Sequence, residues 1–120
     1  MMSIINRMLA LMTVALSGLV VAPGVAQAAT GYDRCPPGYM CLFDDWDGQG
    51  AMAYFQAGSP DLALQNFDNR AQSQRNNNAS NFCAYVNKKY DNSSGSGTYQ
   101  PGTKGNFNAN VNAYSSLRKC

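Results

Sequence analysis

The chain has 120 residues, with nine Lys or Arg against seven acidic residues and no His, which gives a formal net charge of +2. All seven acidic residues are Asp, so the sequence excludes catalysis by His or Glu, metal binding by His, and Ser–His or Cys–His nucleophile pairs. Beyond residue 28, where Arg7 no longer counts, eight cations against seven Asp leave +1. That charge is too small to favour nucleic-acid binding.

Residues 1–28 are predicted to be a secretory signal peptide. Arg7 supplies a positive first region, residues 8–21 are apolar, and Ala26-Gln27-Ala28 offers a cleavage site of small residues. The apolar run is shorter than the roughly 20 residues that span a bilayer, and no second apolar run follows, so we favour a signal peptide over a membrane anchor. We expect a secreted, extracellular protein, with residues 29–120 as one domain that does not bind membranes after signal removal.

Four cysteines lie in this domain: Cys35, Cys41, Cys83 and Cys120. A small domain buries a modest core, and an even number of cysteines in an exported chain predicts two disulfides. A zinc site with four thiolates is the alternative, but the chain lacks any CxxC spacing. Of the three possible pairings we favour Cys35 with Cys41, because Pro36-Pro37-Gly38 can turn the chain back, which leaves Cys83 with Cys120.

The first half of the domain predicts a β-hairpin followed by less regular chain. Met40–Asp44 and Ala51–Gln56 are expected strands, and the acidic, Gly-containing segment 45–50 is the turn between them. Gly58-Ser59-Pro60 then predicts a break. Asp61–Phe67 fits either one helical turn capped by Ser59 or a short strand, and a strand is expected over 71–75.

In the second half the pattern begins again after a polar connector over residues 76–80. Asn81–Val86 is the most strand-like segment of the chain, and residues 88–97 predict a long turn rich in Asn, Ser and Gly. Residues 98–100 predict a short strand before Pro101-Gly102, and Tyr114–Lys119 predicts the last strand.

The two halves form an internal repeat. Cys41-Leu42-Phe43 matches Cys83-Ala84-Tyr85 at an offset of 42, and residues 69–75 match residues 112–118 at an offset of 43. Two units of about 40 residues, each with four short strands, predict an all-β fold of paired Greek keys.

The opening Cys35-Pro-x-Gly-x-x-Cys41, the hairpin Phe43-Asp-Asp with Gly50, and Asp68-Asn-Arg-Ala-x-Ser73 together resemble the secreted bacterial metalloproteinase inhibitors of peptidase inhibitor family thirty-six, a group with βγ-crystallin-type domains. The resemblance spans residues 35–120. It implies a βγ-crystallin-like sandwich of two Greek-key motifs, stapled by disulfides. In such units an aromatic begins the first strand, a hairpin Gly takes positive φ, and a later Ser caps the folded hairpin.

In the first unit these places fall to Phe43, Gly50 and Ser73. The second unit keeps Tyr85 and Ser116, whereas Gly95 or Gly97 replaces its hairpin glycine only loosely. Gly48 stands where the family usually has a second aromatic residue.

Microbial βγ-crystallins bind calcium through a run of two Asn or Asp, two variable residues, Ser or Thr, and Ser. Residues 68–73 and 111–116 resemble this run, but Gln72 replaces a ligating hydroxyl and Val111 replaces the first acid or amide. Calcium prefers six to eight oxygens, some of them anionic, and Asn and Ser also stabilise turns. The resemblance implies the following calcium candidates, and no other cofactor is expected: Asp68, Asn69, Ser73, Asn112, Ser115 and Ser116.

Three aspartates, Asp44, Asp45 and Asp47, surround Trp46. Paired carboxylates with an aromatic are typical of glycosidases, but adjacent strand residues point to opposite faces and no second acidic centre faces them. We therefore favour a solvated turn, with Trp46 as a candidate binding anchor.

Two functions from different classes remain. The first is a secreted, non-enzymatic peptidase inhibitor of metalloproteinases, a monomer whose partner is an extracellular protease and which acts with a rigid disulfide-tied loop. The loops best tied for this are Pro36–Met40 and the turn after Val86. The alternative is a calcium-binding or structural extracellular βγ-crystallin module, for which an antimicrobial role is one option.

Overall fold

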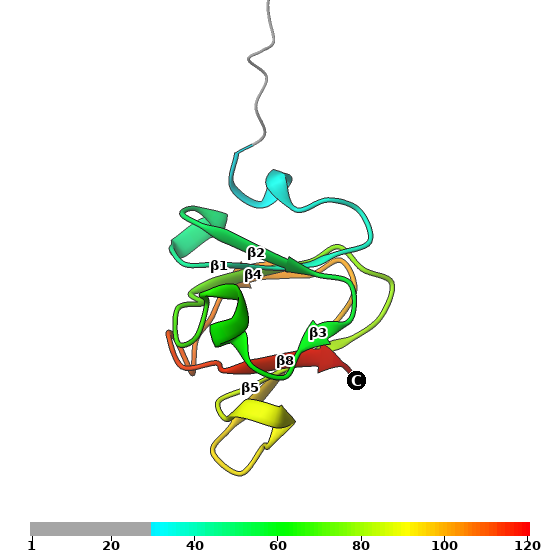
Figure 1. Cartoon of the computed structure of the whole chain (residues 1–120). Helices are drawn as coiled ribbons and strands as arrows, with labels where there is room; N and C mark the ends of the chain where they lie inside the picture. Colours follow the sequence, from blue (N-terminus) through cyan, green and yellow to red (C-terminus); the bar gives the residue numbers. More distant parts are fainter. Residues whose placement is uncertain (1–29) are drawn as a thin grey trace, which may run out of the picture.

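Two four-stranded antiparallel sheets pack face to face in the computed structural model, which describes residues 30–120 (Figure 1). The predicted signal peptide, residues 1–28, lies outside the described residues. Short 3-10 helices, labelled η, connect the strands. In chain order the elements are η1 (Gly31–Arg34), β1 (Met40–Phe43), η2 (Trp46–Gly48), β2 (Met52–Phe55), β3 (Gly58–Ser59), η3 (Leu62–Gln65), β4 (Ser73–Asn76), β5 (Phe82–Tyr85), η4 (Lys88–Tyr90), β6 (Ser96–Tyr99), β7 (Lys104–Asn106) and β8 (Ser116–Lys119).

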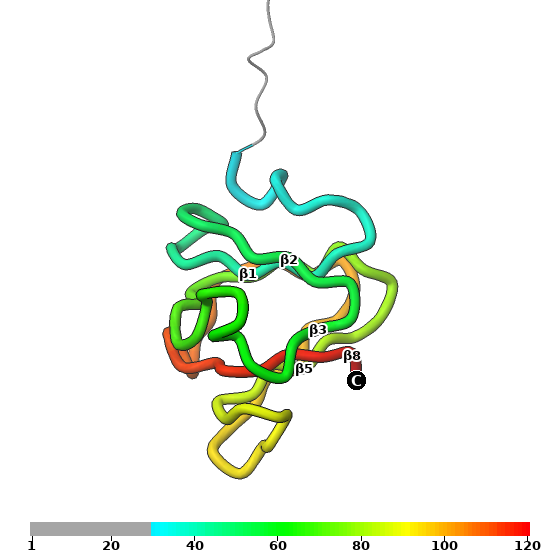
Figure 2. The backbone as a smooth tube through the Cα atoms, in the orientation of Figure 1, coloured from blue at the N-terminus to red at the C-terminus, as the bar shows by residue number. Residues whose placement is uncertain are grey.

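The strand order shows two Greek keys that exchange one strand each. One sheet has the order β2-β1-β4-β7 and the other β3-β8-β5-β6, so the third strand of each unit joins the sheet of the other unit. The tube in Figure 2 shows the chain leaving β2 in the upper layer and entering the lower layer at β3. The predicted all-β fold of paired Greek keys is therefore confirmed.

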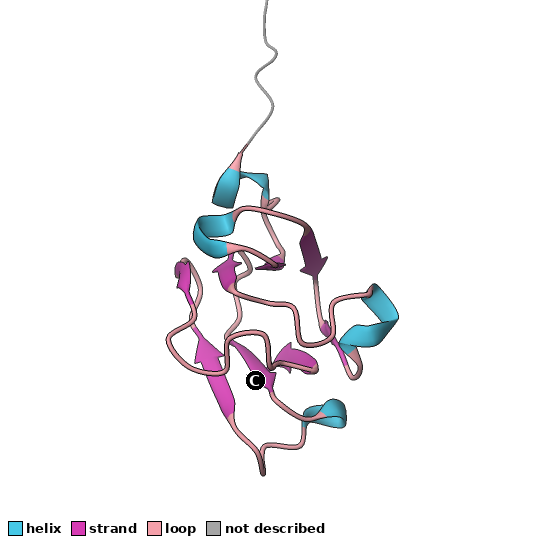
Figure 3. Ribbon diagram, turned by 90° about the vertical axis from the view of Figure 1, so that its left-hand side faces the viewer, coloured by secondary structure: helices cyan, strands magenta, loops and turns pink. Residues whose placement is uncertain are grey.

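The core lies between the two sheets. Inward-facing residues alternate along the strands, as in Met40 and Leu42 of β1 and Phe82 and Ala84 of β5, and all four are fully buried. Figure 3 shows the 3-10 turns around the strands rather than between them. The sheets thus form the scaffold, and the connections carry the exposed surface.

Several local predictions need correction. The segment 58–60, predicted as a break, contains the two-residue strand β3, and the strand β7 was not predicted at all. Both strands are too short to show an alternating pattern of apolar and polar residues. The structure places the last hairpin strand at Ser96–Tyr99 rather than at 98–100. Of the two alternatives for 61–67, the helical turn is found, but its cap is Asp61, whose Oδ1 accepts a hydrogen bond from the Ala63 N–H at 3.0 Å.

Candidate functional site

Two disulfides hold the segment before β1 and the residue Cys120 against the sheets. Cys35 is bonded to Cys41 and Cys83 to Cys120, the pairing that the sequence favours. The first closes a short loop in front of β1, and the second joins β5 to the end of β8. Each bridge therefore makes the chain beside it rigid.

The loop inside the first bridge is held along its whole length. The N–H of Gly38 donates to the Asn77 carbonyl at 2.7 Å, the Gly38 carbonyl accepts from Asn78 Nδ2 at 2.7 Å, and the Tyr39 carbonyl accepts from the Asn77 N–H at 2.8 Å. Pro36 and Pro37 have no N–H to offer. The exposed tip of this loop is rigid, but little of its main chain is free to bind a partner.

A buried serine fastens the folded hairpin in each unit. Ser73 Oγ accepts from the Gly48 N–H at 3.0 Å and donates to the Asp45 carbonyl at 2.7 Å. Ser116 Oγ does the same 43 residues later, with the Tyr90 N–H at 3.0 Å and the Asn87 carbonyl at 2.6 Å. The role that the resemblance implies for both serines is present in the geometry.

Tyr32, from the segment before β1, takes the place of the second aromatic residue that the first unit lacks. The Tyr32 ring lies 5.6 Å from the Phe43 ring, edge to face, as Tyr90 lies 6.0 Å from Tyr85 in the second unit. A Cβ on Gly48 would stand 2.7 Å from Tyr32. Gly48 therefore makes room for Tyr32. In the second unit the position equivalent to Gly48 is Tyr90, which takes φ +62° and carries the second aromatic ring.

The acidic turn around Trp46 is a set of local caps. Asp44 pairs with Arg70 at 2.5 Å and accepts from the Ala51 N–H, and Asp45 Oδ1 accepts from the Trp46 N–H at 2.7 Å. Asp47 Oδ1 accepts from Asn106 Nδ2 at 3.0 Å. Each carboxylate has its own partner, which fits the solvated turn predicted from sequence. Trp46 is 45% exposed.

The two candidate calcium runs meet near the pseudo-twofold axis. The Asn69 N–H donates to the Tyr114 carbonyl at 3.0 Å, the Asn112 N–H donates to the Ala71 carbonyl at 2.9 Å, and Ser115 Oγ donates to Asn69 Oδ1 at 3.4 Å. Asn69 and Asn112 both adopt left-handed backbone. These contacts make the two runs structural partners of each other.

The residues of the runs fit calcium poorly. The hydroxyls of Ser73 and Ser116 are bonded to the hairpins, and Gln72 Nε2 donates to the Asp44 carbonyl at 3.0 Å where a ligating hydroxyl would stand. Within residues 30–120 no three His, Cys, Asp or Glu side chains lie close enough to hold a metal ion. Asp68 Oδ1 is buried without a hydrogen-bond partner. We propose that the two runs serve the fold rather than calcium, which a comparison of Tm with and without calcium tests.

The turn after Val86 is a compact hairpin stabilised by side chains. Asn87 Nδ2 donates to the hydroxyls of Ser93 and Ser94 at 3.2 and 2.9 Å, and the Lys89 N–H donates to the Pro60 carbonyl at 2.8 Å. The Arg118 guanidinium lies 4.4 Å over the Tyr90 ring. Five N–H groups of this turn, those of Lys89, Tyr90, Asp91, Ser93 and Gly95, are therefore used inside the molecule.

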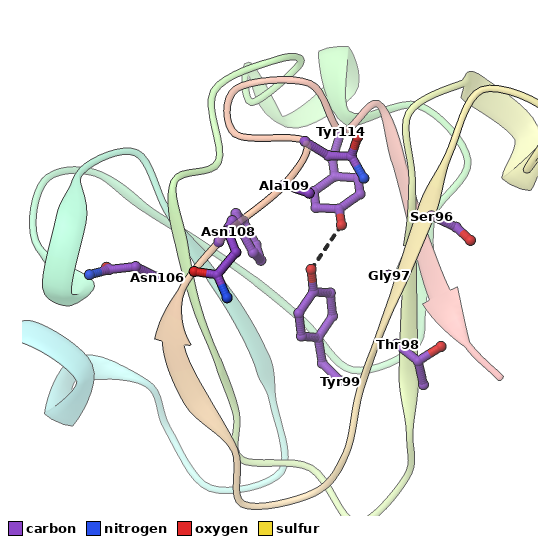
Figure 4. A pocket seen from close by; sticks show the side chains of 10 residues that line it. Ser96, Gly97, Thr98, Tyr99, Asn106, Asn108, Ala109 and Tyr114 are labelled. Atoms are coloured by element: carbon purple, nitrogen blue, oxygen red, sulfur yellow. Dashed lines mark hydrogen bonds between the residues drawn. The ribbon is translucent and has the colours of Figure 1, made fainter.

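One pocket was not predicted from sequence. It encloses about 260 Å³ between β6, the loop over 106–110, and Tyr114 (Figure 4). The hydroxyls of Tyr99 and Tyr114 meet inside it at 2.8 Å. Burial, with a smaller effect of the Tyr114 hydrogen bond, raises the pKa of the Tyr99 phenol well above its ordinary value. Ser and Gly are typical of turns, so Ser96 and Gly97 gave no sequence signal for the strand β6.

The architecture defines a βγ-crystallin-type domain. A βγ-crystallin from Ciona intestinalis matches with a TM-score of 0.60 and 17% identity, over 69% of this chain and 100% of that one. A structure from work on the evolution of the eye-lens βγ-crystallin fold matches with a TM-score of 0.65 and 12% identity, over 78% and 93%. A domain from Clostridium beijerinckii matches with a TM-score of 0.56 and 18% identity, over 67% and 94%. At such identities these likenesses show the fold alone.

Residues 28–97 match the model of peptidase inhibitor family I36, and the chain belongs to that family. No curated protein matches the chain significantly. In the part of the chain that the structure describes, no helix is long and apolar enough to cross a membrane.

Proposed function

We propose that the protein is a secreted inhibitor of metalloproteinases, which binds an extracellular protease with a rigid, disulfide-tied part of its surface. The match to peptidase inhibitor family I36 over residues 28–97 carries this proposal. The metalloproteinase target follows from the resemblance of the Cys35–Cys41 opening and the Phe43 hairpin to secreted bacterial inhibitors of that class.

Export is supported by the predicted signal peptide and by the cysteines. Both bridges are formed within residues 30–120, and that part of the chain has no free thiol. Disulfides of this kind persist in oxidising, extracellular surroundings. An extracellular protease is the partner that fits such a location.

Rigidity supports inhibition rather than cleavage. A protease inhibitor must enter the cleft with little loss of conformational entropy, because ordering a flexible segment costs about 1–2 kcal/mol per residue. The loop within Cys35–Cys41 and the hairpin after Val86 are both held by hydrogen bonds and lie beside bridges. Either segment meets the requirement for preorganisation.

Titration of the oxidised chain, residues 29–120, against a thermolysin-type metalloprotease tests the proposal. We expect inhibition at or below micromolar concentration, and loss of inhibition after both disulfides are reduced. A serine protease of similar size, assayed with a general casein substrate, is the control for target class. Full metalloprotease activity at micromolar oxidised protein would contradict the proposal.

A further inference from the structure

β6 is an edge strand with unpaired main-chain groups. It pairs only with β5, in the register Phe82 to Tyr99 and Ala84 to Gly97. The Val86 N–H donates to the Gly95 carbonyl at 3.0 Å, so these two residues form a hydrogen-bonded pair. Hydrogen-bonded and non-hydrogen-bonded pairs alternate along an antiparallel ladder, so the N–H and carbonyl groups of Gly97 and Tyr99 point toward β5. The N–H and carbonyl groups of Ser96 and Thr98 therefore point to the open side, and no main-chain hydrogen bond within residues 30–120 reaches them.

This edge lacks the usual protection against pairing. Exposed edges are commonly blocked by charged side chains, Pro or bulges. Residues 96–99 include neither a charge nor a Pro. By contrast, β7 begins with Lys104, and β3 has two residues and is followed by Pro60. The edge strand β2 (Met52–Phe55) also has neither a charge nor a Pro, but the pocket touches β6 and not β2. The edge of β6 is thus open to another strand.

The strand is also a rigid template. Cys83 of β5 lies directly opposite Thr98, and its bridge to Cys120 ties β5 to β8. A preorganised edge binds a partner strand without first paying for its own ordering. The main-chain groups of Ser96 and Thr98 on its open side are free.

The pocket lies at this same edge. All four residues of β6 line it, and Figure 4 shows the Tyr99 and Tyr114 rings converging in it from opposite sides. The Phe107 ring packs 5.3 Å from Tyr99 and 5.1 Å from Tyr114, and none of the lining residues is charged. One of the two phenol protons joins the two oxygens, and the other remains for a ligand.

We propose that the free edge of β6 and this pocket form the surface that the protease binds, an inference that rests on the proposed function. A strand from the enzyme's cleft pairs with the main chain of Ser96 and Thr98. Residues directly opposite in paired strands point to the same face, so the enzyme residue facing Gly97 places its side chain in the pocket. The pocket's chemistry selects an uncharged side chain, apolar or with a neutral hydrogen-bonding group.

Proline substitution gives a matched pair of variants. Thr98→Pro removes an N–H that faces the open side, and an edge strand tolerates Pro at such a position. Tyr54→Pro is the control: Tyr54 pairs with Cys41 as Thr98 pairs with Cys83, and it lies on the edge strand of the other sheet. A third variant, Asn108→Trp, places a large ring at the pocket from an exposed loop residue.

The experiment measures the inhibition constant of each variant against a thermolysin-type metalloprotease, with circular dichroism to verify folding. We expect Thr98→Pro to weaken inhibition at least tenfold, because it leaves a carbonyl of the enzyme strand without its partner. Asn108→Trp should weaken inhibition at least tenfold by filling the pocket, and Tyr54→Pro should change it less than threefold. Amide exchange of the unmodified chain is measured in parallel. The amides of Ser96 and Thr98 should be slowed in the complex and fast in the free protein.

The outcomes distinguish failure of the β6 surface from failure of the proposed function. If the unmodified chain inhibits but Thr98→Pro and Asn108→Trp inhibit equally well, or Ser96 and Thr98 exchange freely in the complex, this surface is overturned and the proposed function stands. If the unmodified chain does not inhibit, both are overturned. Slow exchange of these amides in concentrated free protein, together with a dimer in sedimentation, would assign the edge to a second copy and also overturn the proposal.

Discussion

Replacing Ser73 by Ala tests the reasoning about the repeated hairpin most sharply. Ser73 is fully buried, and its hydroxyl bonds both the Gly48 N–H and the Asp45 carbonyl. Gly48 is buried, so its N–H loses its partner at a cost of about 1–3 kcal/mol, whereas the exposed Asp45 can bond to water and loses about 1 kcal/mol. The expected destabilisation of Ser73→Ala is therefore about 2–4 kcal/mol.

Urea unfolding of the oxidised chain measures this value, with the slope of the transition held constant as the test that the native fold is kept. For a domain of this size each kcal/mol lowers Tm by about 4–8 °C. Ser116→Ala should cost a similar amount, because its hydroxyl makes the equivalent pair of bonds. Ser96→Ala, an exposed serine on β6, is the control and should stay within about 0.5 kcal/mol. A loss below about 0.5 kcal/mol for both buried serines would refute the reasoning.

Four further predictions follow from the structure. Removing the Cys83–Cys120 bridge by a double Ser substitution should cost about 4 kcal/mol and removing Cys35–Cys41 about 2 kcal/mol, since the bridges close sequence separations of 37 and 6 residues; equal losses in urea unfolding would contradict this order. The pKa of the Tyr99 phenol is raised in the folded state, so this group does not affect the free energy of unfolding below pH 10 and lowers it above pH 10 by about 1.4 kcal/mol per pH unit. Tyr99→Phe should reduce this loss of stability at high pH, measured as urea midpoints over a pH series. Tyr32→Ala should lower stability by about 2–4 kcal/mol, because it removes the ring that fills the space beside Gly48 and Phe43; a loss no larger than for the exposed Tyr54→Ala would show that the N-terminal segment is dispensable. Calcium at 1 mM should leave Tm unchanged relative to EDTA, whereas a site with a Kd near 10 µM would add about 2.7 kcal/mol.

The repeat made the fold predictable from sequence. Phe43 and Tyr85, with Ser73 and Ser116, stand at offsets of 42 and 43 residues, and these spacings reflect the pseudo-twofold relation of the two sheets. The disulfide pairing was also predictable, because a Pro-Pro-Gly turn brings Cys35 and Cys41 together. The repeated aromatic and serine positions form a pattern along the chain, and the Cys35–Cys41 bridge depends on a local turn, so the sequence reveals both.

Other features could not be predicted because they depend on contacts far apart in the chain. Tyr32 fills the space at Gly48 only when the N-terminal segment folds over the first sheet, and no local pattern links the two residues. The strands β3 and β7 form because each pairs with a strand of the other unit, β3 with β8 and β7 with β4. Their own residues have little intrinsic preference for strand structure. The pocket at β6 likewise needs Tyr99 and Tyr114, which only the packing of the sheets brings together.

Calorimetric titration of the oxidised chain into a thermolysin-type metalloprotease, repeated with the enzyme's cleft filled by a small active-site inhibitor, tests the central claim most directly. We expect one inhibitor bound per enzyme, and loss of the binding heat when the cleft is already occupied. Binding that persists unchanged with the cleft filled, or no binding to the open enzyme at micromolar concentration, would contradict inhibition at the protease cleft.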